Sequence, residues 1–273
     1  MGSGVHMITS VRNRRVAQAR RLHRSGVRRQ EGLTLLEGPR LVSEGAEAGL
    51  LQTVFVATNA DIIAEHAAEA ATAAGAEVLR CSPHVVSAAS ESHGPQGIVA
   101  IGHVPHVDGL AEPALILIID GIQDPGNLGS LVRTAAAAGA SMIFRSPGSA
   151  DPFSPKAMRA GAGAQFRIPI RDTESPTTLP STIQTTRFHA SAADGEINYD
   201  QIDWTEPSGV VVGAETRGVS TAWLSACLST VRVPLHHGVE SLNAAAAAAV
   251  ILFEAARQRT AESPIGEQGA RTA

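Results

Sequence analysis

The sequence predicts an α/β protein in which strands and helices alternate along most of the chain. Short apolar runs with strand character are separated by alanine-rich or amphipathic segments with helical spacing. The run at 115–120 (LILIID) is apolar on both faces, as expected for a central parallel strand. The chain has 273 residues, of which 44% are hydrophobic and 18% charged, so it has room for one large or two ordinary domains with a sizeable core.

The first hundred residues predict a small α/β domain. An arginine-rich helix with a thin apolar stripe is expected over residues 8–25, and Gly26 marks a break after it. Pro39 is well placed for the first turn of the helix that follows the first strand. The expected strands are 33–38, 51–58, 76–81 and 97–104, and the expected helices are 39–48, 60–74 and 83–90. We therefore predict a first domain over residues 8–102.

Residues 103–113 contain two prolines and a glycine among few apolar residues, which predicts a linker. A second α/β domain is expected over residues 114–260. Its expected strands are 115–120, 141–145, 165–170, 187–192, 209–213 and 231–235, and its expected helices are 127–138, 154–162, 221–229 and 241–259. A weak helix is expected before the strand at 187, and an irregular polar stretch over 194–208. Residues 261–273 predict a flexible tail.

Charge is distributed unevenly along the chain. Residues 1–40 contain nine arginines and two glutamates, a balance of +7, which leaves −11 for the remainder because the whole chain carries −4. A basic arm on an acidic body suggests a polyanionic partner, most simply RNA or DNA. The alternative, a solvated arginine-rich helix, stays open on this observation alone.

Three glycine-containing turns each follow an apolar strand-like run and precede a helical segment, at 120–133, 213–220 and 236–243. Ligands in open α/β sheets bind at the carboxyl ends of strands, and helix starts leave backbone N–H groups unpaired. We therefore expect the three turns to form one cofactor pocket. The spacing Gly126-Asn-Leu-Gly129 is neither the dinucleotide pattern nor a phosphate-binding loop, so it does not define the cofactor by itself.

Two residues of these turns, Arg133 and Glu215, each allow a functional and a purely structural interpretation. Arg133 lies one helical turn after the first loop, where it either serves the site or pairs with a surface carboxylate. Glu215 lies between two glycines, where it either faces a ligand or complements a helix dipole. Ser241 is a candidate N-cap, Asn243 offers both a donor and an acceptor, and the alanines at 244–249 favour close packing of the last helix.

Other chemistries find little support in the sequence. Cys81 and Cys227 lack metal-like spacing and are expected to be buried free thiols in a reducing cytosol. His236 and His237 have no further ligands to complete a metal set. No apolar run approaches the length of a membrane span and no secretory signal is visible. We therefore expect a cytoplasmic protein with neither metal nor membrane partner.

The three turns resemble the signature motifs of one family. DGIQDPGNLGSLVRTAAAAGA, VVVGAETRGVS and VRVPLHHGVESLNAAAAAAV are similar to the three motifs of the SpoU/TrmH branch of SPOUT methyltransferases, which are S-adenosylmethionine-dependent RNA ribose 2′-O-methyltransferases. The resemblance covers residues 115–259. Residues 8–101 also resemble the L30e-like substrate-binding domain of the family's ribosomal-RNA members, mainly through Arg14, Arg15 and LTLLEGPR.

The resemblance implies a mostly parallel sheet flanked by helices and tied in a deep trefoil knot, an exception to the usual absence of knots. It also implies S-adenosylmethionine bound in the knot, and a homodimer formed through the knotted domain with the helix at 241–259 in the interface. The sequence departs from the family pattern at Ala214, where asparagine is common, and at His237, where glycine is usual.

The resemblance carries roles onto particular residues. The implied catalytic residues are Asn127, Arg133, Glu215, Ser241 and Asn243. The implied cofactor-binding residues are Gly213, Ala214, Glu215, Gly218, Val233, Leu235, Ser241, Leu242 and Asn243. The RNA-binding candidates are Arg12, Arg14, Arg15 and Arg40. Arg133 is the family's proposed base for the 2′-hydroxyl, but a guanidinium stays protonated, so we favour an electrostatic role for it.

We therefore expect an enzyme that transfers a methyl group from S-adenosylmethionine to a ribose 2′-hydroxyl of structured RNA, most simply 23S or another ribosomal RNA. The alternative is a non-catalytic RNA-binding or ribosome-assembly protein on the same knotted scaffold, motivated by Ala214 and His237. A nucleotide-dependent dehydrogenase is a distant third, because the dinucleotide glycine spacing and its downstream acidic residue are missing.

Overall fold

The computed structural model describes residues 7–92, 94, 96–109 and 114–262. The described chain forms two compact units. The first comprises the N-terminal part to Val107 together with residues 125–133 and 151–167, and the second comprises the other segments from Asp108 onward. Most of the predicted tail, 263–273, and residues 110–113 of the predicted linker lie outside the described residues. The domain boundaries given above stay predictions.

The first unit is built on a four-stranded sheet. Its strands are, in spatial order, β1 (Leu33–Glu37), β4 (Ile98–His103), β2 (Leu51–Ala57) and β3 (Glu77–Cys81). The central strand β4 runs antiparallel to β1 and β2, whereas β3 is parallel to β2. Each strand lies within two residues of its predicted range. The side chains of β1, β2 and β4 are mostly buried on both faces of the sheet, whereas those of the edge strand β3 are mostly half-buried.

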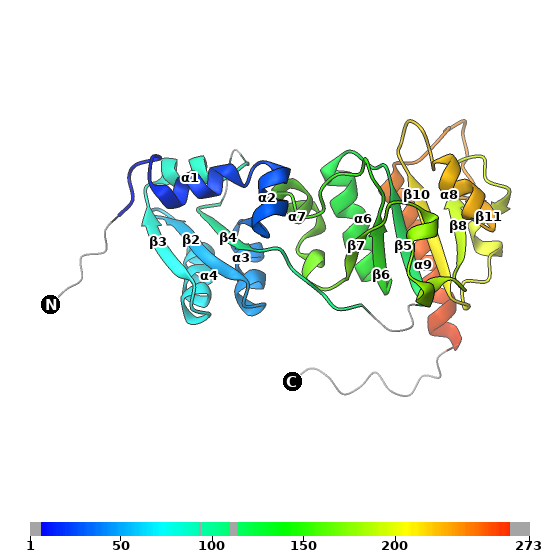
Figure 1. The fold of residues 1–273 in the computed structure, drawn as a ribbon, viewed down its shortest axis with the longest axis horizontal. Helices are drawn as coiled ribbons and strands as arrows, with labels where there is room; N and C mark the ends of the chain where they lie inside the picture. The colour runs from blue at the N-terminus through cyan, green and yellow to red at the C-terminus, as the bar shows by residue number, and fades with distance from the viewer. Residues whose placement is uncertain (1–6, 93, 95, 110–113, 263–273) are drawn as a thin grey trace. The chain divides into compact units, whose positions relative to one another are not determined.

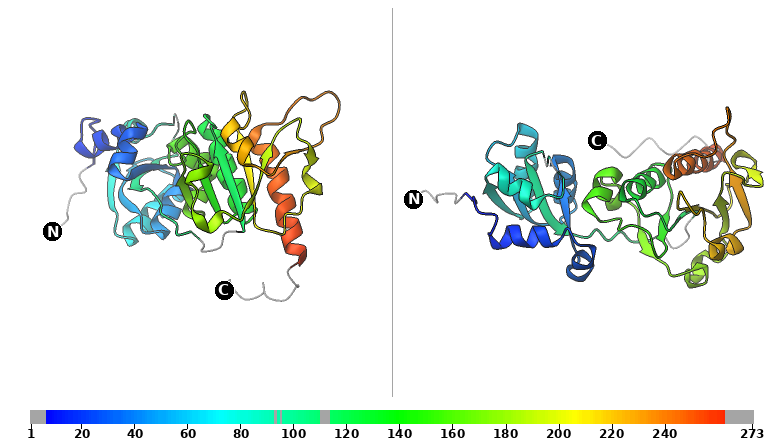
Figure 2. Two further views of the ribbon diagram at one scale, coloured as in Figure 1. Left: turned by 45° about the vertical axis from the view of Figure 1, so that its right-hand side comes forward. Right: turned by 90° about the horizontal axis from the view of Figure 1, so that it is seen from above.

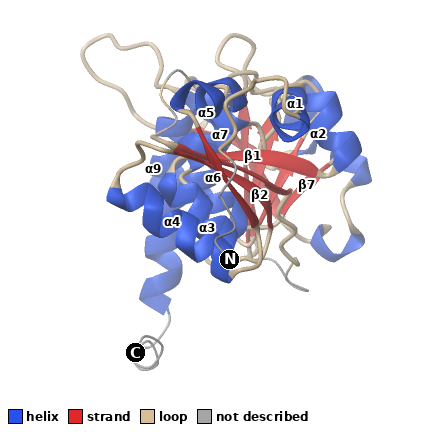
Figure 3. Ribbon diagram, turned by 90° about the vertical axis from the view of Figure 1, so that its left-hand side faces the viewer, coloured by secondary structure: helices blue, strands red, loops and turns tan. Residues whose placement is uncertain are grey.

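Helices cover both faces of the four-stranded sheet (Figures 1 and 3). One face is covered by α1 (Arg14–Arg21) and α5 (Pro83–Ala89), and the other by α3 (Pro39–Glu47) and α4 (Ile62–Ala73). Pro39 occupies the first turn of α3, as predicted. This arrangement is the small α/β domain that the sequence predicts.

The predicted helix over 8–25 is wrong in its extent. Helix α1 begins after Asn13, whose side-chain oxygen accepts a hydrogen bond from the Arg15 backbone N–H at 2.8 Å. A second helix, α2 (Ser25–Glu31), follows and ends at Gly32, which has a φ of +64°. Gly26 therefore lies inside α2, and the break is at residues 22–24. Burial of Val16, Ala19 and Leu22 against the sheet fixes where α1 stops.

The second unit is built on a seven-stranded sheet in which every pair of neighbouring strands is parallel. Its strands are, in spatial order, β7 (Ile170–Asp172), β6 (Met142–Arg145), β5 (Leu115–Asp120), β10 (Ser208–Gly213), β8 (Arg187–Ser191), β11 (Ser229–Arg232) and β9 (Ile197–Asn198). The two central strands, β5 and β10, are almost entirely buried, which explains their continuous apolar sequences.

Two helices, α8 (Thr221–Ala226) and α9 (Ala244–Glu262), pack against the sheet of the second unit. Trp223 of α8 packs with Phe188 and the apolar side chains of the central strands. Helix α9 packs against β10 and runs along the sheet (Figure 2). Between β11 and α9 the chain crosses from one part of the sheet to another through 233–243. This return agrees with the knotted α/β fold that the resemblance implies.

Several predicted elements of the second half are displaced. The predicted strand at 165–170 is wrong: residues 164–166 form the short 3₁₀ helix η1 (Ala164–Phe166) and the strand is β7. The predicted strand at 231–235 is β11 at 229–232, because the pairing with β8 and β9 ends there and Pro234 has no N–H for a ladder. The weak helix before β8 consists of two 3₁₀ turns, η2 (Pro176–Thr178) and η3 (Ser181–Ile183), and β9 precedes η4 (Tyr199–Gln201).

Two further helices complete the structure, namely α6 (Pro125–Ala137) and α7 (Pro155–Gly161). The first half of α6, residues 125–133, belongs to the first unit together with α7 and η1. Among the described residues, no helix is both long and apolar enough to cross a membrane.

Candidate cofactor site

One pocket of about 190 Å³ lies in the second unit where the loops after β8, β10 and β11 meet the start of α9. Every residue predicted to bind the cofactor lines this pocket, with the exception of Asn243. The lining residues are Ser191, Ala192, Ala193, Val212, Gly213, Ala214, Glu215, Gly218, Val233, Leu235, Ser241, Leu242, Ala244 and Ala247. The structure thus brings together the second and third motifs, which are separated by ten residues in the sequence.

The second-motif loop folds tightly over the carboxyl end of β10. The Gly218 backbone N–H donates a hydrogen bond to the Ala214 carbonyl at 2.8 Å, which closes the loop 214–218 on itself. Gly218 has a φ of +65°, which favours glycine. A Cβ at Gly213 would lie 2.1 Å from the Gly218 carbonyl carbon, so no other residue fits at this position without movement of the loop. The structure therefore explains glycine at both motif positions. Gly218 has a left-handed backbone conformation, and Gly213 has no space for a side chain.

Asp120 is a buried residue of this region that the sequence reading did not single out. It ends β5, and its Oδ1 accepts a hydrogen bond from the Ser146 hydroxyl at 2.6 Å. Its Oδ2 accepts a hydrogen bond from the Ser220 backbone N–H at 2.7 Å. The carboxylate therefore holds the end of the second-motif loop to the central strands. In the sequence, Asp120 could have been identified as the single acidic residue that ends the apolar run LILIID.

The third motif begins its helix later than predicted. Helix α9 starts at Ala244, so Ser241 is not its N-cap. Asn243 takes that role: its Oδ1 accepts hydrogen bonds from the backbone N–H groups of Ala245 at 3.0 Å and Ala246 at 3.3 Å. Ser241 is released from the helix and lines the pocket instead. Asparagine and serine are both good caps, so sequence alone does not choose between them.

The alanine run at the start of α9 has two faces. Ala244, Ala245 and Ala248 are buried, which confirms the expectation that small side chains pack closely here, whereas Ala246 is exposed. Ala247 lines the pocket. The alanine run therefore both packs against the rest of the second unit and forms part of the pocket wall.

His237, where the family commonly has glycine, has a φ of +57°, and Gly238 after it has a φ of +73°. Both residues therefore take a left-handed conformation that glycine adopts without strain. The His237 side chain is exposed and does not line the pocket. The positive φ at position 237 explains why glycine is favoured there in the family.

We expect His237→Gly to leave the affinity for S-adenosylmethionine within about twofold of the wild type, a change of about 0.4 kcal/mol. Glycine adopts the observed φ, and the side chain that it removes lies outside the pocket wall. Isothermal titration calorimetry on both proteins measures the effect. A large loss of affinity would show instead that the imidazole contacts the cofactor.

The first-motif residues lie on α6. Asn127 is half-buried near its start, and Arg133 lies almost two turns later. The Arg133 side chain is exposed and makes no hydrogen bond or ion pair with any other described residue, which resolves the two readings against a surface pair. Neither residue lines the pocket described above. The structure therefore does not test whether they meet the second and third motifs.

The RNA-binding candidates Arg12, Arg14, Arg15 and Arg40 are all exposed. Arg15 pairs with Glu77 at 2.8 Å, and Arg40 pairs with Glu44 at 3.3 Å. Arg28 belongs to the same basic segment but is 4% exposed, so it is not part of the charged surface that the composition suggested. Burial could not be read from composition, because arginine is seldom buried.

Sequence reasoning missed the stretch 191–193 of the pocket wall. They comprise the last residue of β8 and the first two residues after it. Strand β8 lies beside β10 in the sheet, with Ala190 opposite Val211. Residues 191–193 carry no motif, and only the strand order identifies them. Among the described residues, no cluster of three or more His, Cys, Asp or Glu side chains has a geometry that would hold a metal ion.

The chain matches the SpoU rRNA Methylase family over residues 114–253. Residues 13–100 match the MRM3-like substrate binding domain. These two matches cover the regions in which the sequence resembles a methyltransferase and its attached substrate-binding domain.

Relatives named as rRNA methyltransferases match most of the chain. The chain is 32% identical to the 23S rRNA (guanosine(2553)-2′-O)-methyltransferase RlmP of Bacillus subtilis, over 90% of this chain and 97% of the relative. It is 30% identical to a 23S rRNA (uridine(2479)-2′-O)-methyltransferase of Streptomyces viridochromogenes, over 85% of each chain. It is also 30% identical to the human mitochondrial rRNA methyltransferase 3, over 85% of this chain and 69% of the relative.

Solved structures agree with the fold. The SpoU methyltransferase AviRb from Streptomyces viridochromogenes, in complex with the cofactor AdoMet, superposes with a TM-score of 0.82 at 29% identity. That match covers 91% of this chain and 99% of the other. An AdoMet-bound rRNA methyltransferase from Sinorhizobium meliloti superposes with a TM-score of 0.79 at 29% identity, over 92% and 97% of the two chains. With its parallel sheet, its converging motif loops and these relatives, the chain belongs to the SpoU rRNA methylase family.

Proposed function

We propose that this protein transfers the methyl group of S-adenosylmethionine to a ribose 2′-hydroxyl of ribosomal RNA. The observation that carries the proposal is the pocket of the second unit, where the loops of the second and third motifs meet. Family membership and the relatives, which are named as rRNA 2′-O-methyltransferases, support the same reaction. No feature of the described pocket favours the non-catalytic alternative over this one.

The pocket fits the cofactor in its chemistry. Val212, Val233 and Leu235 offer apolar surface for an adenine ring, while Glu215 and Ser241 offer polar groups for hydroxyl and ammonium groups. Gly213 and Gly218 expose backbone at the loop where a ligand approaches. When bound, S-adenosylmethionine supplies an electrophilic methyl group on a sulfonium sulfur. Orientation of the attacking hydroxyl then provides much of the rate enhancement.

The protein's own residues hold the ribose and stabilise the developing charge. Arg133 is an exposed, permanently charged donor that binds a phosphate and favours the 2′-oxyanion as it forms. Asn127 and Asn243 orient the reacting groups, and Asn243 does so from a helix cap that fixes its own position. Ser241 and Glu215 line the pocket and complete the proposed catalytic set.

The exposed arginines at the N-terminus provide the RNA-binding surface in this proposal. We expect the double variant Arg12→Gln and Arg14→Gln to weaken binding to an rRNA fragment, and to reduce the slope of log K against log salt concentration by about one per lost phosphate contact. Both side chains are exposed, so the fold is unaffected. Fluorescence anisotropy at several salt concentrations measures the slope. Arg257→Gln, which removes one exposed charge from α9, is the control, and an unchanged slope in the double variant would exclude this surface.

We further propose a homodimer formed through the C-terminal unit, and a cytoplasmic location. Phe253 on α9 is 51% exposed, which is unusual for a large aromatic side chain, and it lies on the helix that the family resemblance assigns to the interface. Cys81 and Cys227 are free thiols, which supports a reducing compartment. Light scattering on the wild type and on Phe253→Glu tests the dimer.

The decisive experiment maps 2′-O-methylated nucleotides on ribosomal RNA from cells with and without the gene. One site lost with the gene, and restored in vitro by the purified protein and S-adenosylmethionine, is the expected result. An unchanged methylation map together with no binding at millimolar cofactor would support the non-catalytic alternative instead.

A further inference from the structure

The segment 151–167 packs inside the first unit although it follows β6 of the second unit in the sequence. Met158 of α7 is completely buried in the same apolar cluster as Leu36, Leu41 and Val42. Phe153 and Phe166 pack against that cluster from either end of the segment. The segment is therefore part of the core of the first unit.

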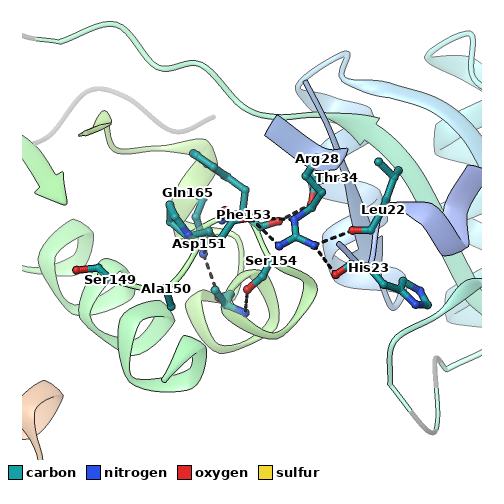
Figure 4. A network of polar contacts seen from close by, with 12 residues as sticks. Leu22, His23, Arg28, Thr34, Ser149, Ala150, Asp151, Phe153, Ser154 and Gln165 are labelled. Carbon is teal, nitrogen blue, oxygen red and sulfur yellow. Dashed lines mark hydrogen bonds and ion pairs between the residues drawn. The ribbon is translucent and has the colours of Figure 1, made fainter. Parts of the chain in front are cut away.

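A buried ionic contact holds the start of this segment (Figure 4). Arg28 of α2 donates from Nε and Nη2 to Asp151 Oδ2, at 2.9 and 2.6 Å. Its Nη1 donates to the carbonyl oxygens of Leu22 and His23, at 2.7 and 3.0 Å. The guanidinium is thus enclosed on several sides, and only 4% of the side chain is exposed.

A second buried carboxylate holds α7. Glu37, the last residue of β1, has a side chain that is 1% exposed and accepts a hydrogen bond from Arg159 Nη1. Its other oxygen accepts a hydrogen bond from the Glu91 backbone N–H at 2.5 Å. Arg159 lies on α7, so this pair joins the helix to the end of the first strand of the sheet.

Helix α7 in turn touches the first half of α6, which carries Asn127 and Arg133. A Cβ at Gly129 would lie 2.3 Å from the Ala157 carbonyl oxygen and 2.9 Å from the Gly161 backbone nitrogen. The two helices therefore approach backbone to backbone at Gly129. Arg133 lies one helical turn beyond that contact, so a shift of α7 displaces the turn from which its side chain projects.

Apolar contacts already hold α7 on the sheet, and burying charged groups there carries a desolvation penalty. A buried ion pair contributes little net stability compared with apolar side chains of the same volume, and in some proteins its role is to specify one geometry. Arg159 is 34% exposed, so Glu37 is the buried member of its pair, and removal of Arg159 would leave a buried carboxylate without its cation. We therefore infer that the two pairs serve mainly to fix the position of the segment on the sheet, and that they contribute little to its stability.

We propose that Glu37 and Arg159 are positioning residues for the reaction: they fix α7 on the four-stranded sheet, and through the contact at Gly129 they set the position of Arg133. The proposal rests on the proposed function for its kinetic consequence. The structural consequence, an ordered first half of α6, does not depend on catalysis.

The test compares Glu37→Gln with Glu65→Gln in the full-length protein. Both variants replace one carboxylate that pairs with an arginine in the first unit, but Glu65 joins α4 to Arg80 of β3 and has no contact with α7. Hydrogen–deuterium exchange of peptides covering 125–133 is the first readout. We expect protection there to fall about tenfold in Glu37→Gln, and to be unchanged in Glu65→Gln and in peptides of α9. Equal protection at 125–133 in all three proteins would overturn the proposal.

Kinetics provide the second readout. We expect Glu37→Gln to lower kcat for rRNA methylation about tenfold with KM for RNA and the affinity for S-adenosylmethionine little changed. Arg159→Lys keeps the positive charge but loses the planar guanidinium group. We expect its kcat to lie between those of Glu37→Gln and the wild type. A lower melting temperature with unchanged kcat and unchanged exchange would show that the pair only stabilises the fold.

The two hypotheses fail separately in this design. No methylation by the wild-type protein would refute the proposed function, and the exchange measurement would still decide whether Glu37 orders α6. Activity in the wild type with normal kcat and normal exchange in Glu37→Gln would refute only the positioning role.

Discussion

Replacement of Arg133 by alanine is expected to lower the rate of RNA methylation by about 10²- to 10³-fold, the range seen when a donor to a developing oxyanion is removed. The side chain is exposed and makes no hydrogen bond or ion pair with any other described residue, so we expect its loss not to disturb α6. It also does not line the described pocket, and the affinity for S-adenosylmethionine is expected to stay within about twofold. Single-turnover methyl transfer and calorimetry measure the two quantities.

Arg133→Lys separates charge from shape. Lysine keeps a positive charge but cannot donate the two parallel hydrogen bonds of a guanidinium, so we expect an intermediate rate. If the alanine variant retained full activity, Arg133 would have no part in the chemistry. If instead the alanine variant lost cofactor binding, the residue would belong to the cofactor site.

Gly213→Ala is expected to have the second large effect, on cofactor binding. The added methyl group would lie 2.1 Å from the Gly218 carbonyl carbon, where no flexible side chain can move aside. Overpacking of this kind typically costs about 1–3 kcal/mol, and here the loop that moves forms the pocket wall. We expect the dissociation constant for S-adenosylmethionine to rise by at least about tenfold, as measured by calorimetry.

A matched control for this substitution is Gly26→Ala. Gly26 lies in α2 with no atom within 4 Å of the position of an added Cβ, and alanine favours helix. That variant is expected to be neutral or slightly more stable. Normal cofactor affinity in Gly213→Ala would mean that the loop 214–218 rearranges without consequence, and that it does not hold the cofactor.

Much of the fold follows from local patterns. The strands β1, β2, β3, β4, β5 and β10 were predicted closely, since apolar alternation or continuous apolar runs depend only on neighbouring residues. The converging loops of the second and third motifs were predicted because strand ends of a parallel sheet meet at one edge. The trefoil threading has no periodic signal and came only from the family resemblance.

The remaining features depend on long-range contacts. The start of α9 lies three residues after its predicted position because Ser241 and Asn243 are equally good caps and Asn243 is the one used. The burial of Arg28 has no local signal in the sequence, because its partner, Asp151, is more than a hundred residues away. Asp120 begins the first motif, but its structural role has no local signal because its two partners, Ser146 and Ser220, come from separate loops.

The packing of 151–167 into the first unit changes what can be exchanged between relatives. A chimera that replaces residues 8–102 alone would leave Met158, Arg159 and Asp151 facing a foreign surface without Glu37 and Arg28 as partners. The exchangeable module is therefore discontinuous in sequence and includes α7 with the N-terminal sheet. In evolutionary terms, substrate recognition and this part of the methylase region are expected to vary together as one inherited block.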